Sequence, residues 1–307
     1  MTRVLVVGEA LIDAVTGPDG VTNEHVGGSP ANVAFGLAAL EHDVDLATWI
    51  GQDDRGERIE SVCRSRGVTL TAGSRSAAHT PVAHASVDAA GVATYTFDLE
   101  WDLAPVADPA AYGHVHTGSI AAVLEPGGTV VRQTLAEVRE HATISYDPNA
   151  RPSLMGAAEE AVRTVEAVVR ISDVVKLSDE DVAWLYPGLD LADVTERLCD
   201  AGPALVVVTR GPLGARARLS RTGEEIELPA PTSEVVDTVG AGDSFMAGLL
   251  SGLLDAGLLG GSPERARWAQ VGLAEIAPAL RRALATAACT VARAGAHSPR
   301  RADLEAV

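Results

Sequence analysis

The sequence predicts the α/β fold class, with a mostly parallel central sheet covered by helices on both faces. The first observation is the order of segments: apolar runs of strand length alternate with amphipathic segments of helix length through most of the chain. The second is size and composition, because 307 residues that are 47% hydrophobic can bury a large core. Strands that alternate with helices in this way are typical of a parallel sheet between two layers of helices.

The N-terminal elements follow this alternation closely. VLVVG (4–8) is expected to be the first buried strand, PANVAFGLAALE (30–41) the first helix, and VDLATWIG (44–51) the next strand. Pro30 fits the start of this helix, because proline is preorganised for the first helical position. Further along the chain we expect strands over 114–120, 143–148, 174–178 and 205–211, helices over 127–141 and 155–171, and a hairpin over 215–230.

Two segments of the N-terminal third depart from the alternation. Residues 13–27 and about 80–99 alternate polar and apolar side chains between glycine turns, which is typical of half-exposed antiparallel strands. We expect them to form a small β-sheet that extends from the main body as a lid over a site. Because no internal repeat or low-complexity linker interrupts the chain, residues 1–307 are expected to form one domain with this discontinuous lid.

The charge and the cysteine content disfavour several classes of function. The net charge of −18 argues against a nucleic-acid partner, which needs clustered Lys and Arg, and against an anionic membrane surface. The three cysteines are isolated, as expected of reduced thiols, and the N-terminus has no signal-peptide pattern. The most apolar late stretch is interrupted by Asp255 and is too short to span a bilayer. We therefore expect a cytoplasmic protein that binds neither nucleic acid nor membrane.

The stretch DTVGAGDSFMAG (237–248) combines nearly bare backbone with one acid. It follows the strand-like piece SEVVDT and precedes an apolar helical segment, so it is expected at a strand-to-helix turn. The first amides of a helix have no internal partners and attract anions, and Gly240, Ala241 and Gly242 would let a phosphoryl group approach them. Asp243 either accepts a proton from the hydroxyl that attacks this phosphate or caps the helix.

A second glycine-rich element, GGSPANVAFGLAAL (27–40), places Asn32 on the first turn of a helix. Such a helix start can bind a polyhydroxylated ligand through its backbone amides and the Asn side chain, or it is an ordinary glycine turn. Arg151 follows a predicted strand at its carboxyl end, where open α/β sheets place their ligands. Lys176 is the only lysine of the chain, and a compact ammonium suits a phosphate.

Six segments in order resemble the motifs of the ribokinase/fructokinase family of sugar kinases, and look most like bacterial fructokinases. They are GGSPANVAFGLAAL, WIGQDDRGERI (49–59), DPNARP (147–152), VVKLSDEDV (174–182), VVTRGPLGA (207–215) and DTVGAGDSFMAG. The resemblance covers residues 4–299 and implies a ribokinase-like, Rossmann-type three-layer sandwich with a β-sheet lid. It also implies ATP and Mg²⁺ as cofactors, K⁺ as an additional ion, and a homodimer formed through the lid.

The resemblance assigns roles to individual residues. Asp243 falls on the catalytic base, and the anion hole falls on Gly240, Ala241 and Gly242. The sugar side is expected to be lined by Asp13, Gly28, Asn32, Arg151 and Asp243. The nucleotide side is expected to comprise Lys176, Thr209, Gly211, Gly214 and Gly242. A monovalent-cation loop is expected at Asp237, Val239 and Gly295.

The chain departs from the family pattern in three places. Ser178 and Asp181 occupy the positions of an Asn-x-x-Glu motif that helps to organise Mg²⁺ and phosphate. Glu41 stands near the end of the first helix where a glycine is usual, which should lower local stability. The lid segment TFDLEWDL (96–103) lacks the Tyr-Arg pair of many fructokinases. In this segment Phe97 and Trp101 would pack on a sugar face or join two lids in a dimer.

The sequence therefore predicts an ATP-dependent sugar kinase, with fructose as the first choice of substrate because GGSPANVA and DPNxRP look more like fructokinases than ribokinases. The alternative substrate is 2-keto-3-deoxygluconate, which is favoured if Arg151 faces a sugar carboxylate. A different class of function is a non-catalytic sugar- or nucleotide-sensing protein on the same fold. His116, on a predicted strand end, either faces the sugar or is structural.

Overall fold

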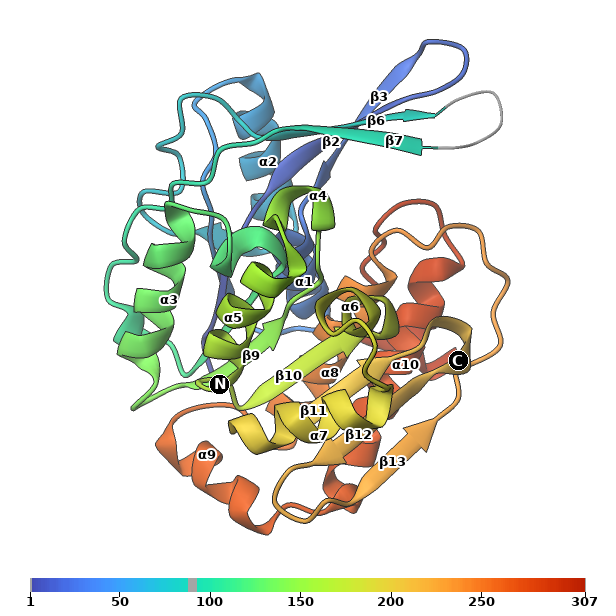
Figure 1. Ribbon diagram of the computed structural model, residues 1–307. Coiled ribbons are helices and arrows are strands. Elements are labelled where there is room, and N and C mark those ends of the chain that lie inside the picture. The colour runs from blue at the N-terminus through green and yellow to red at the C-terminus, as the bar shows by residue number, and fades with distance from the viewer. Residues whose placement is uncertain (1, 88–92, 307) are drawn as a thin grey trace.

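The computed structural model describes residues 2–87 and 93–306 and has two sheets. The larger sheet is nine-stranded, in the order β13-β12-β11-β10-β9-β8-β1-β4-β5, and is parallel except for its β12–β13 edge (Figure 1). Its strands are β1 (Val4–Val7), β4 (Val44–Ala47), β5 (Val68–Leu70), β8 (His114–Gly118), β9 (Thr143–Asp147), β10 (Val174–Ser178), β11 (Leu205–Thr209), β12 (Ala215–Leu219) and β13 (Glu225–Leu228). The predicted α/β fold class, with a mostly parallel central sheet, is confirmed.

Helices cover both faces of this sheet because successive strand residues point to opposite sides. Val4 and Val6 pack into one hydrophobic cluster, and Leu5 and Val7 into the other. The first cluster is covered by α1 (Ser29–Ala39), α2 (Asp54–Ser65), α8 (Ala241–Asp255) and α10 (Leu273–Val291). The second is covered by α3 (Gly127–Val138), α5 (Ala158–Val169), α6 (Asp179–Leu185) and α7 (Leu191–Ala201). The shorter helices are α4 (Pro152–Met155), α9 (Ser262–Arg267) and 3₁₀ turns over Pro109–Ala111, Ser119–Ala122, Gly211–Leu213, Trp268–Gln270 and Arg301–Ala306.

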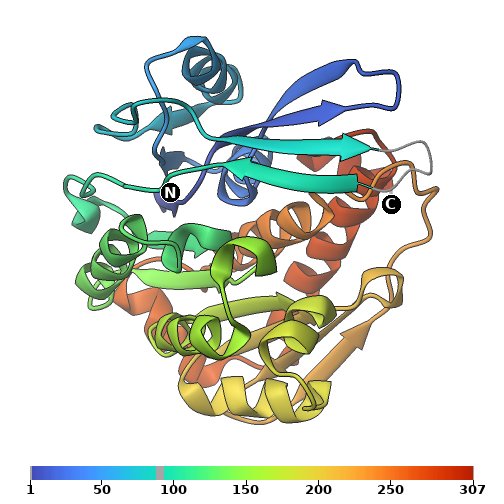
Figure 2. The same cartoon turned by 45° about the horizontal axis from the view of Figure 1, so that its top comes forward.

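The smaller sheet has the order β3-β2-β6-β7 and extends beside the body (Figure 2). Its strands are β2 (Leu11–Thr16), β3 (Thr22–Gly27), β6 (Val82–Val87) and β7 (Ala93–Asp98). The expectation of purely antiparallel strands is wrong at its centre, because β2 and β6 pair in parallel. Each is the first strand of an antiparallel hairpin, and the two hairpins join through these first strands. Residues 88–92 of the expected 80–99 segment lie outside the described residues.

Several local expectations need correction. The segment SEVVDT forms no strand, so the cradle at the start of α8 follows an irregular loop instead of a strand. The helix expected over 155–171 begins only at Ala158, after Gly156 adopts a left-handed φ of 74°. Glu41, directly after the C-cap of α1, has a φ of 68°, a conformation that costs a non-glycine residue about 1 kcal/mol. Among the described helices, none is long and apolar enough to cross a membrane.

Candidate active site

The carboxylate of Asp243 is the point where three distant segments meet. It lies in the first turn of α8 and is only 6% exposed. Its Oδ1 accepts a hydrogen bond from Ser29 Oγ at 2.6 Å, and its Oδ2 accepts one from Asn32 Nδ2 at 2.8 Å. Asn149 Nδ2, from the loop after β9, lies 3.2 Å from Oδ1. No side-chain hydrogen bond caps α8, so this carboxylate is held by α1 and the β9 loop and does not cap its own helix.

The start of α8 forms a cradle of unobstructed backbone. Gly240 has a left-handed φ of 74°, and a Cβ there would lie 2.6 Å from Ala296 Cβ, so only glycine fits. In the described part of the chain, the backbone N–H groups of Gly242 and Asp243 donate a hydrogen bond to no acceptor. These free amides and the helix dipole form an anion-binding position.

Lys176 supplies a buried positive charge beside this cradle. A Cβ built on Gly242 would lie 3.3 Å from Lys176 Nζ, so the ammonium borders the free amides. Nζ pairs with Asp147 Oδ2 at 2.9 Å, and both side chains are almost completely buried. Burial opposes the charge of Lys176, but the carboxylates of Asp147, Asp181 and Asp243 together raise its pKa, so it stays protonated. Burial raises the pKa of Asp147 to about 6, and its Oδ1 has no hydrogen-bond partner among the described residues.

The expected sugar-side residues gather around Asp243. Asp13 lies half-buried on β2, and burial raises its pKa to about 6 although His25 and Arg151 oppose the shift. Gly28 has a φ of 102°, and a Cβ there would lie 2.4 Å from the Glu9 carbonyl oxygen, so α1 begins directly against the β1–β2 connection.

Arg151 is half-buried and turns back on its own loop. Its Nη1 donates to the Asn149 carbonyl at 2.8 Å, to Asn149 Oδ1 at 2.7 Å and to the Ala150 carbonyl at 3.1 Å. Asn149 is held at a φ of 36°, an unusual conformation for a non-glycine residue, and the guanidinium braces this turn. Ser29 and Asn149 both contact Asp243, but neither was singled out from the sequence. Ser29 adjoins the quoted glycines, and the DPN motif contains Asn149.

Glu9 is the most informative residue that was not predicted from the sequence. It directly follows β1 and is 5% exposed, and its buried Oε2 has no hydrogen-bond partner among the described residues. Burial raises the pKa of Glu9 to about 7, while Ser119 and Arg151 oppose the shift and Asp243 adds to it. The signal was present in the sequence, because an acid at the carboxyl end of a buried strand follows the same rule that identified Arg151.

The expected nucleotide side lies along the ends of β10 and β11. Thr209 ends β11, and its hydroxyl donates to the Leu177 carbonyl at 3.3 Å. Gly211 and Gly214 have φ of 50° and 93°, and a Cβ on Gly214 would lie 2.1 Å from the Leu228 carbonyl. Only glycine therefore fits at position 214 of this turn. The large apolar side chains that are exposed include Leu213, Val235, Val236 and Val239.

The three residues expected in a cation loop do come together. Asp237 Oδ1 accepts a hydrogen bond from the Val239 amide at 3.0 Å, and its Oδ2 accepts one from the Gly295 amide at 2.8 Å. These hydrogen bonds lower the pKa of Asp237, with that from Val239 the strongest, so the carboxylate stays ionised. The loop before α8 is thereby fastened to the segment after α10.

The Ser178–Asp181 pair forms a closed capping box at the start of α6. Ser178 Oγ accepts from the Asp181 amide at 3.0 Å, and Asp181 Oδ2 accepts from the Ser178 amide at 2.7 Å. The other carboxylate oxygen, Oδ1, accepts from the Ala150 amide at 2.7 Å. Both oxygens of Asp181 are thus engaged within the protein, whereas Asp147 nearby keeps one oxygen without a partner in the described part of the chain.

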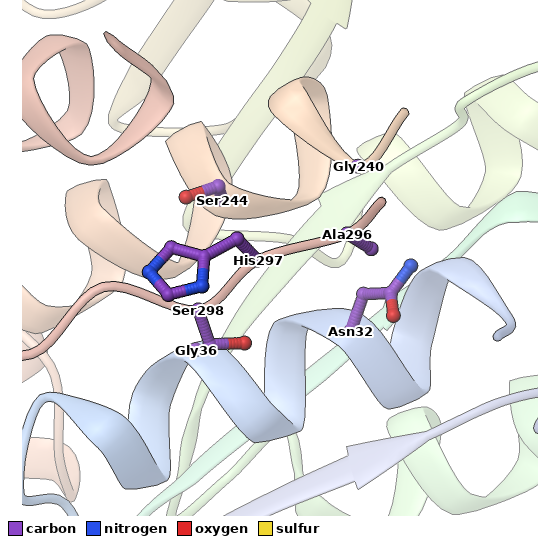
Figure 3. A pocket seen from close by; sticks show the side chains of 7 residues that line it. All are labelled: Asn32, Gly36, Gly240, Ser244, Ala296, His297 and Ser298. Carbon is purple, nitrogen blue, oxygen red and sulfur yellow. The ribbon is translucent and has the colours of Figure 1, made fainter. Parts of the chain in front are cut away.

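A small pocket lies behind the cradle, between α1, α8 and the chain after α10 (Figure 3). Its volume of about 10 Å³ suits one water molecule and is far too small for a sugar. It is lined by Asn32, Gly36, Gly240, Ser244, Ala296, His297 and Ser298.

Two side chains considered for contact with the sugar, His116 and Trp101, are structural. His116 is 1% exposed, and its Nδ1 lies 2.9 Å from Ser145 Oγ inside the sheet. Burial lowers the pKa of His116 to about 3, so it is neutral. Trp101 is 2% exposed and donates from Nε1 to the Ala121 carbonyl at 3.0 Å, so it belongs to the core and not to the lid surface.

The sequence matches the family model described as "pfkB family carbohydrate kinase" over residues 1–303. A fructokinase from Klebsiella pneumoniae is 31% identical, covering 83% of this chain and 86% of the relative. A putative sugar kinase from Pyrococcus horikoshii is 28% identical over 81% of each chain.

Two solved structures share the fold. A fructokinase from Xylella fastidiosa with bound ATP has a TM-score of 0.84 at 23% identity, over 99% of this chain and 97% of the other. A fructokinase double mutant from Vibrio cholerae O395, with fructose, ADP and a potassium ion, has a TM-score of 0.82 at 25% identity, over 100% and 98%.

Proposed function

This chain belongs to the pfkB family of carbohydrate kinases, and we propose that within this family it transfers the γ-phosphoryl group of ATP to fructose. As a family member it is a sugar kinase, a phosphotransferase that acts on a sugar hydroxyl. Fructose is supported by the fructokinase relatives, of which that from Klebsiella pneumoniae is 31% identical. The observation that carries the proposal is the buried Asp243 carboxylate beside the free amides of α8 and the Lys176 ammonium.

On the acceptor side, Asp243 accepts the proton of the attacking hydroxyl. Ser29 and Asn32 hold both of its oxygens, so the carboxylate is oriented before the sugar arrives. Asp13 and Asn32 orient the other sugar hydroxyls, and Gly28, packed against the Glu9 carbonyl, begins the turn of α1 that faces the sugar. Arg151 lines the same side and fixes the turn that carries Asn149.

On the donor side, the phosphoryl group lies over Gly240, Ala241 and Gly242. The Ala241 amide already donates to the Thr238 carbonyl at 3.2 Å, so the free amides of Gly242 and Asp243, together with Lys176, offset the negative charge that develops during transfer. Catalysis of phosphoryl transfer depends mainly on such electrostatic stabilisation and on positioning. Thr209, Gly211 and Gly214 border the nucleotide. The exposed Leu213, Val235, Val236 and Val239 are apolar side chains available to contact its base.

Mg²⁺ would accompany the nucleotide and neutralise charge on the phosphates. Asp147 suits such an ion better than Asp181 does. Asp147 has a buried oxygen without a hydrogen-bond partner among the described residues, whereas both oxygens of Asp181 already accept hydrogen bonds. K⁺ would be placed at the loop of Asp237, Val239 and Gly295. The potassium ion bound by the Vibrio cholerae O395 fructokinase supports the choice of ion.

The remaining parts of the proposal concern assembly and location. The four-stranded sheet serves as the lid of a single domain, in which strands β2, β3, β6 and β7 close over the sugar and exclude water. It also joins two chains as a homodimer, and the protein acts in the cytoplasm.

A second candidate substrate is 2-keto-3-deoxygluconate. It is favoured by Arg151, which makes no ion pair with a carboxylate of the described residues and so has charge available for a sugar acid. The third candidate, a non-catalytic sensor on the same fold, is favoured by the Ser178–Asp181 departure alone.

The test is a coupled ADP-release assay with ATP and a panel of ketoses, aldoses, sugar acids and nucleosides. Fructose-dependent ADP release with the highest kcat/KM of the panel is the expected result. A preference for the sugar acid would favour the second candidate. Saturable sugar binding without turnover of any compound would contradict the kinase and favour the sensor.

A further inference from the structure

Glu9 is a buried acid that none of the catalytic steps above uses. Its backbone is fixed on two sides: a Cβ on Gly28 would lie 2.4 Å from the Glu9 carbonyl, and the next amide, of Ala10, donates to Thr48 Oγ1 at 2.9 Å. The preceding Gly8 packs so closely on Pro30 that a Cβ would lie 2.2 Å from its Cγ. The backbone that carries Glu9 is therefore closely packed, and the residue is only 5% exposed.

One oxygen of this carboxyl, Oε2, is buried and has no hydrogen-bond partner in the described part of the chain. An unpartnered buried carboxyl oxygen is unfavourable for stability, since burial without a hydrogen bond costs about 1–3 kcal/mol. Ser119, which interacts with the carboxyl from the end of β8, is itself held at a strained φ of 53°. Unfavourable features that cluster at one place are typical of functional sites.

The charges around Glu9 belong to the sugar side of the site. The positive charge of Arg151 lowers the pKa of both Glu9 and Asp13, whereas the negative charge of Asp243 raises both. His25, on β3, is the remaining ionisable group that acts on Asp13. Among the described residues Arg151 forms an ion pair with neither carboxyl group, so its charge acts on both of them only through space.

We infer that Glu9 determines the charge of the accepted substrate: its carboxylate offsets Arg151 and so favours neutral sugars over sugar acids. This inference rests on the proposed sugar-kinase function and concerns the same site. A substrate carboxylate placed near Arg151 would face Asp13, Asp243 and Glu9 in a region with little water to screen them. A neutral ketose meets no such repulsion. Glu9 acts on the substrate through the electrostatic field of its charge, so it is a specificity-determining residue and not a catalytic one.

The charge of Glu9 changes within the ordinary working pH range, because burial raises its pKa to about 7. Raising the pH from 6 to 8 ionises this carboxyl and should weaken sugar-acid binding relative to fructose binding. The carboxylate of a sugar acid is ionised throughout this range, so the substrate does not produce the change.

The test compares dissociation constants by calorimetry, with fructose and 2-keto-3-deoxygluconate as neutral and anionic probes, at pH 6, 7 and 8. Glu9→Gln should improve sugar-acid affinity relative to fructose on the order of tenfold at pH 8, the effect of one charge over roughly 10 Å at an effective dielectric constant of about 20. It should also remove most of the pH dependence of this ratio. Asp45→Asn is the matched control, because Asp45 is 4% exposed and holds Arg3 and Tyr112 near the start of β4.

An unchanged ratio in Glu9→Gln, or equal changes for both sugars, would overturn the inference. The pH dependence of the ratio in the unmodified protein is a second measurement that needs no variant, and a flat ratio between pH 6 and 8 would also contradict it. Failure of the proposed function has a different signature, the absence of fructose turnover. If the unmodified protein binds neither probe, Glu9→Gln must gain sugar-acid binding, and no gain refutes the inference.

Discussion

Replacing Glu9 with Gln should remove a loss of stability that depends on pH, so the variant should become more stable relative to the unmodified protein as the pH rises. In the folded chain, burial raises the pKa of Glu9 from its ordinary value of 4.5 to about 7. The folded state therefore holds this proton more tightly than the unfolded state does. Stability is lost as the pH rises from about 4.5 through about 7, and the loss is complete above that. Gln cannot ionise, so the variant avoids this loss.

The magnitude follows from the two pKa values. The interval between 4.5 and about 7, at about 1.36 kcal/mol per pKa unit, corresponds to about 3 kcal/mol at pH 8. The entropy of unfolding is about 2.1 cal/mol/K per residue, so in a chain of 307 residues this free energy shifts the melting temperature by about 5 °C. The amide of Gln adds an offset of its own, but this offset does not depend on pH.

Thermal unfolding of both proteins at pH 5, 6, 7 and 8 isolates the pH-dependent part. The melting temperature of Glu9→Gln relative to the unmodified protein should rise with pH and level off near pH 8. Asp13, whose pKa burial raises to about 6, titrates in both proteins and largely cancels in the difference. A difference that is the same at every pH, or that falls as the pH rises, would refute the assignment of Glu9 as a buried ionisable acid.

Three further substitutions test separate parts of the site. Lys176→Met should lower kcat/KM for ATP on the order of a hundredfold while fructose affinity changes less than about threefold, because the ammonium adjoins the phosphate cradle and not the sugar; a loss confined to fructose affinity would contradict this. Glu41→Gly should raise the free energy of unfolding by about 1 kcal/mol in urea, since Glu41 has a φ of 68°, whereas Glu41→Ala should bring no gain. Ser178→Ala should cost about 1 kcal/mol of stability through the lost cap on the Asp181 amide. It should leave KM for ATP within about twofold, and a large rise in KM would instead indicate a role in phosphate or metal binding.

The fold class was accessible from the sequence because strand-length and helix-length segments alternate along the chain. VLVVG and LVVVTRG lie in fully covered parallel strands, and such strands are continuous apolar runs. SEVVDT has the same local character but forms no strand, and Val235 and Val236 are 64% and 60% exposed. Local pattern cannot decide whether a partner strand is available to pair with such a segment.

Only part of the candidate site could be predicted from the sequence. Asp243 and Asn32 were identified from their own motifs, but the hydrogen bond between them joins positions 211 residues apart and needs the folded chain. The parallel pairing of β2 and β6 depends in the same way on how two hairpins leave the body. The position of Glu9 after a buried strand was the available signal, but its burial and its unpartnered oxygen become visible only in the folded chain.

The central claim is that Asp243 is the base of a sugar kinase. Its most direct test is Asp243→Asn, measured as fructose-dependent ADP release together with the dissociation constants of ATP and fructose. We predict that kcat falls on the order of a hundredfold or more, because the attacking hydroxyl loses its proton acceptor. ATP affinity should stay within about threefold, because the amides of the cradle and Lys176 remain. A variant that releases ADP at a near-normal rate with fructose would contradict the assignment.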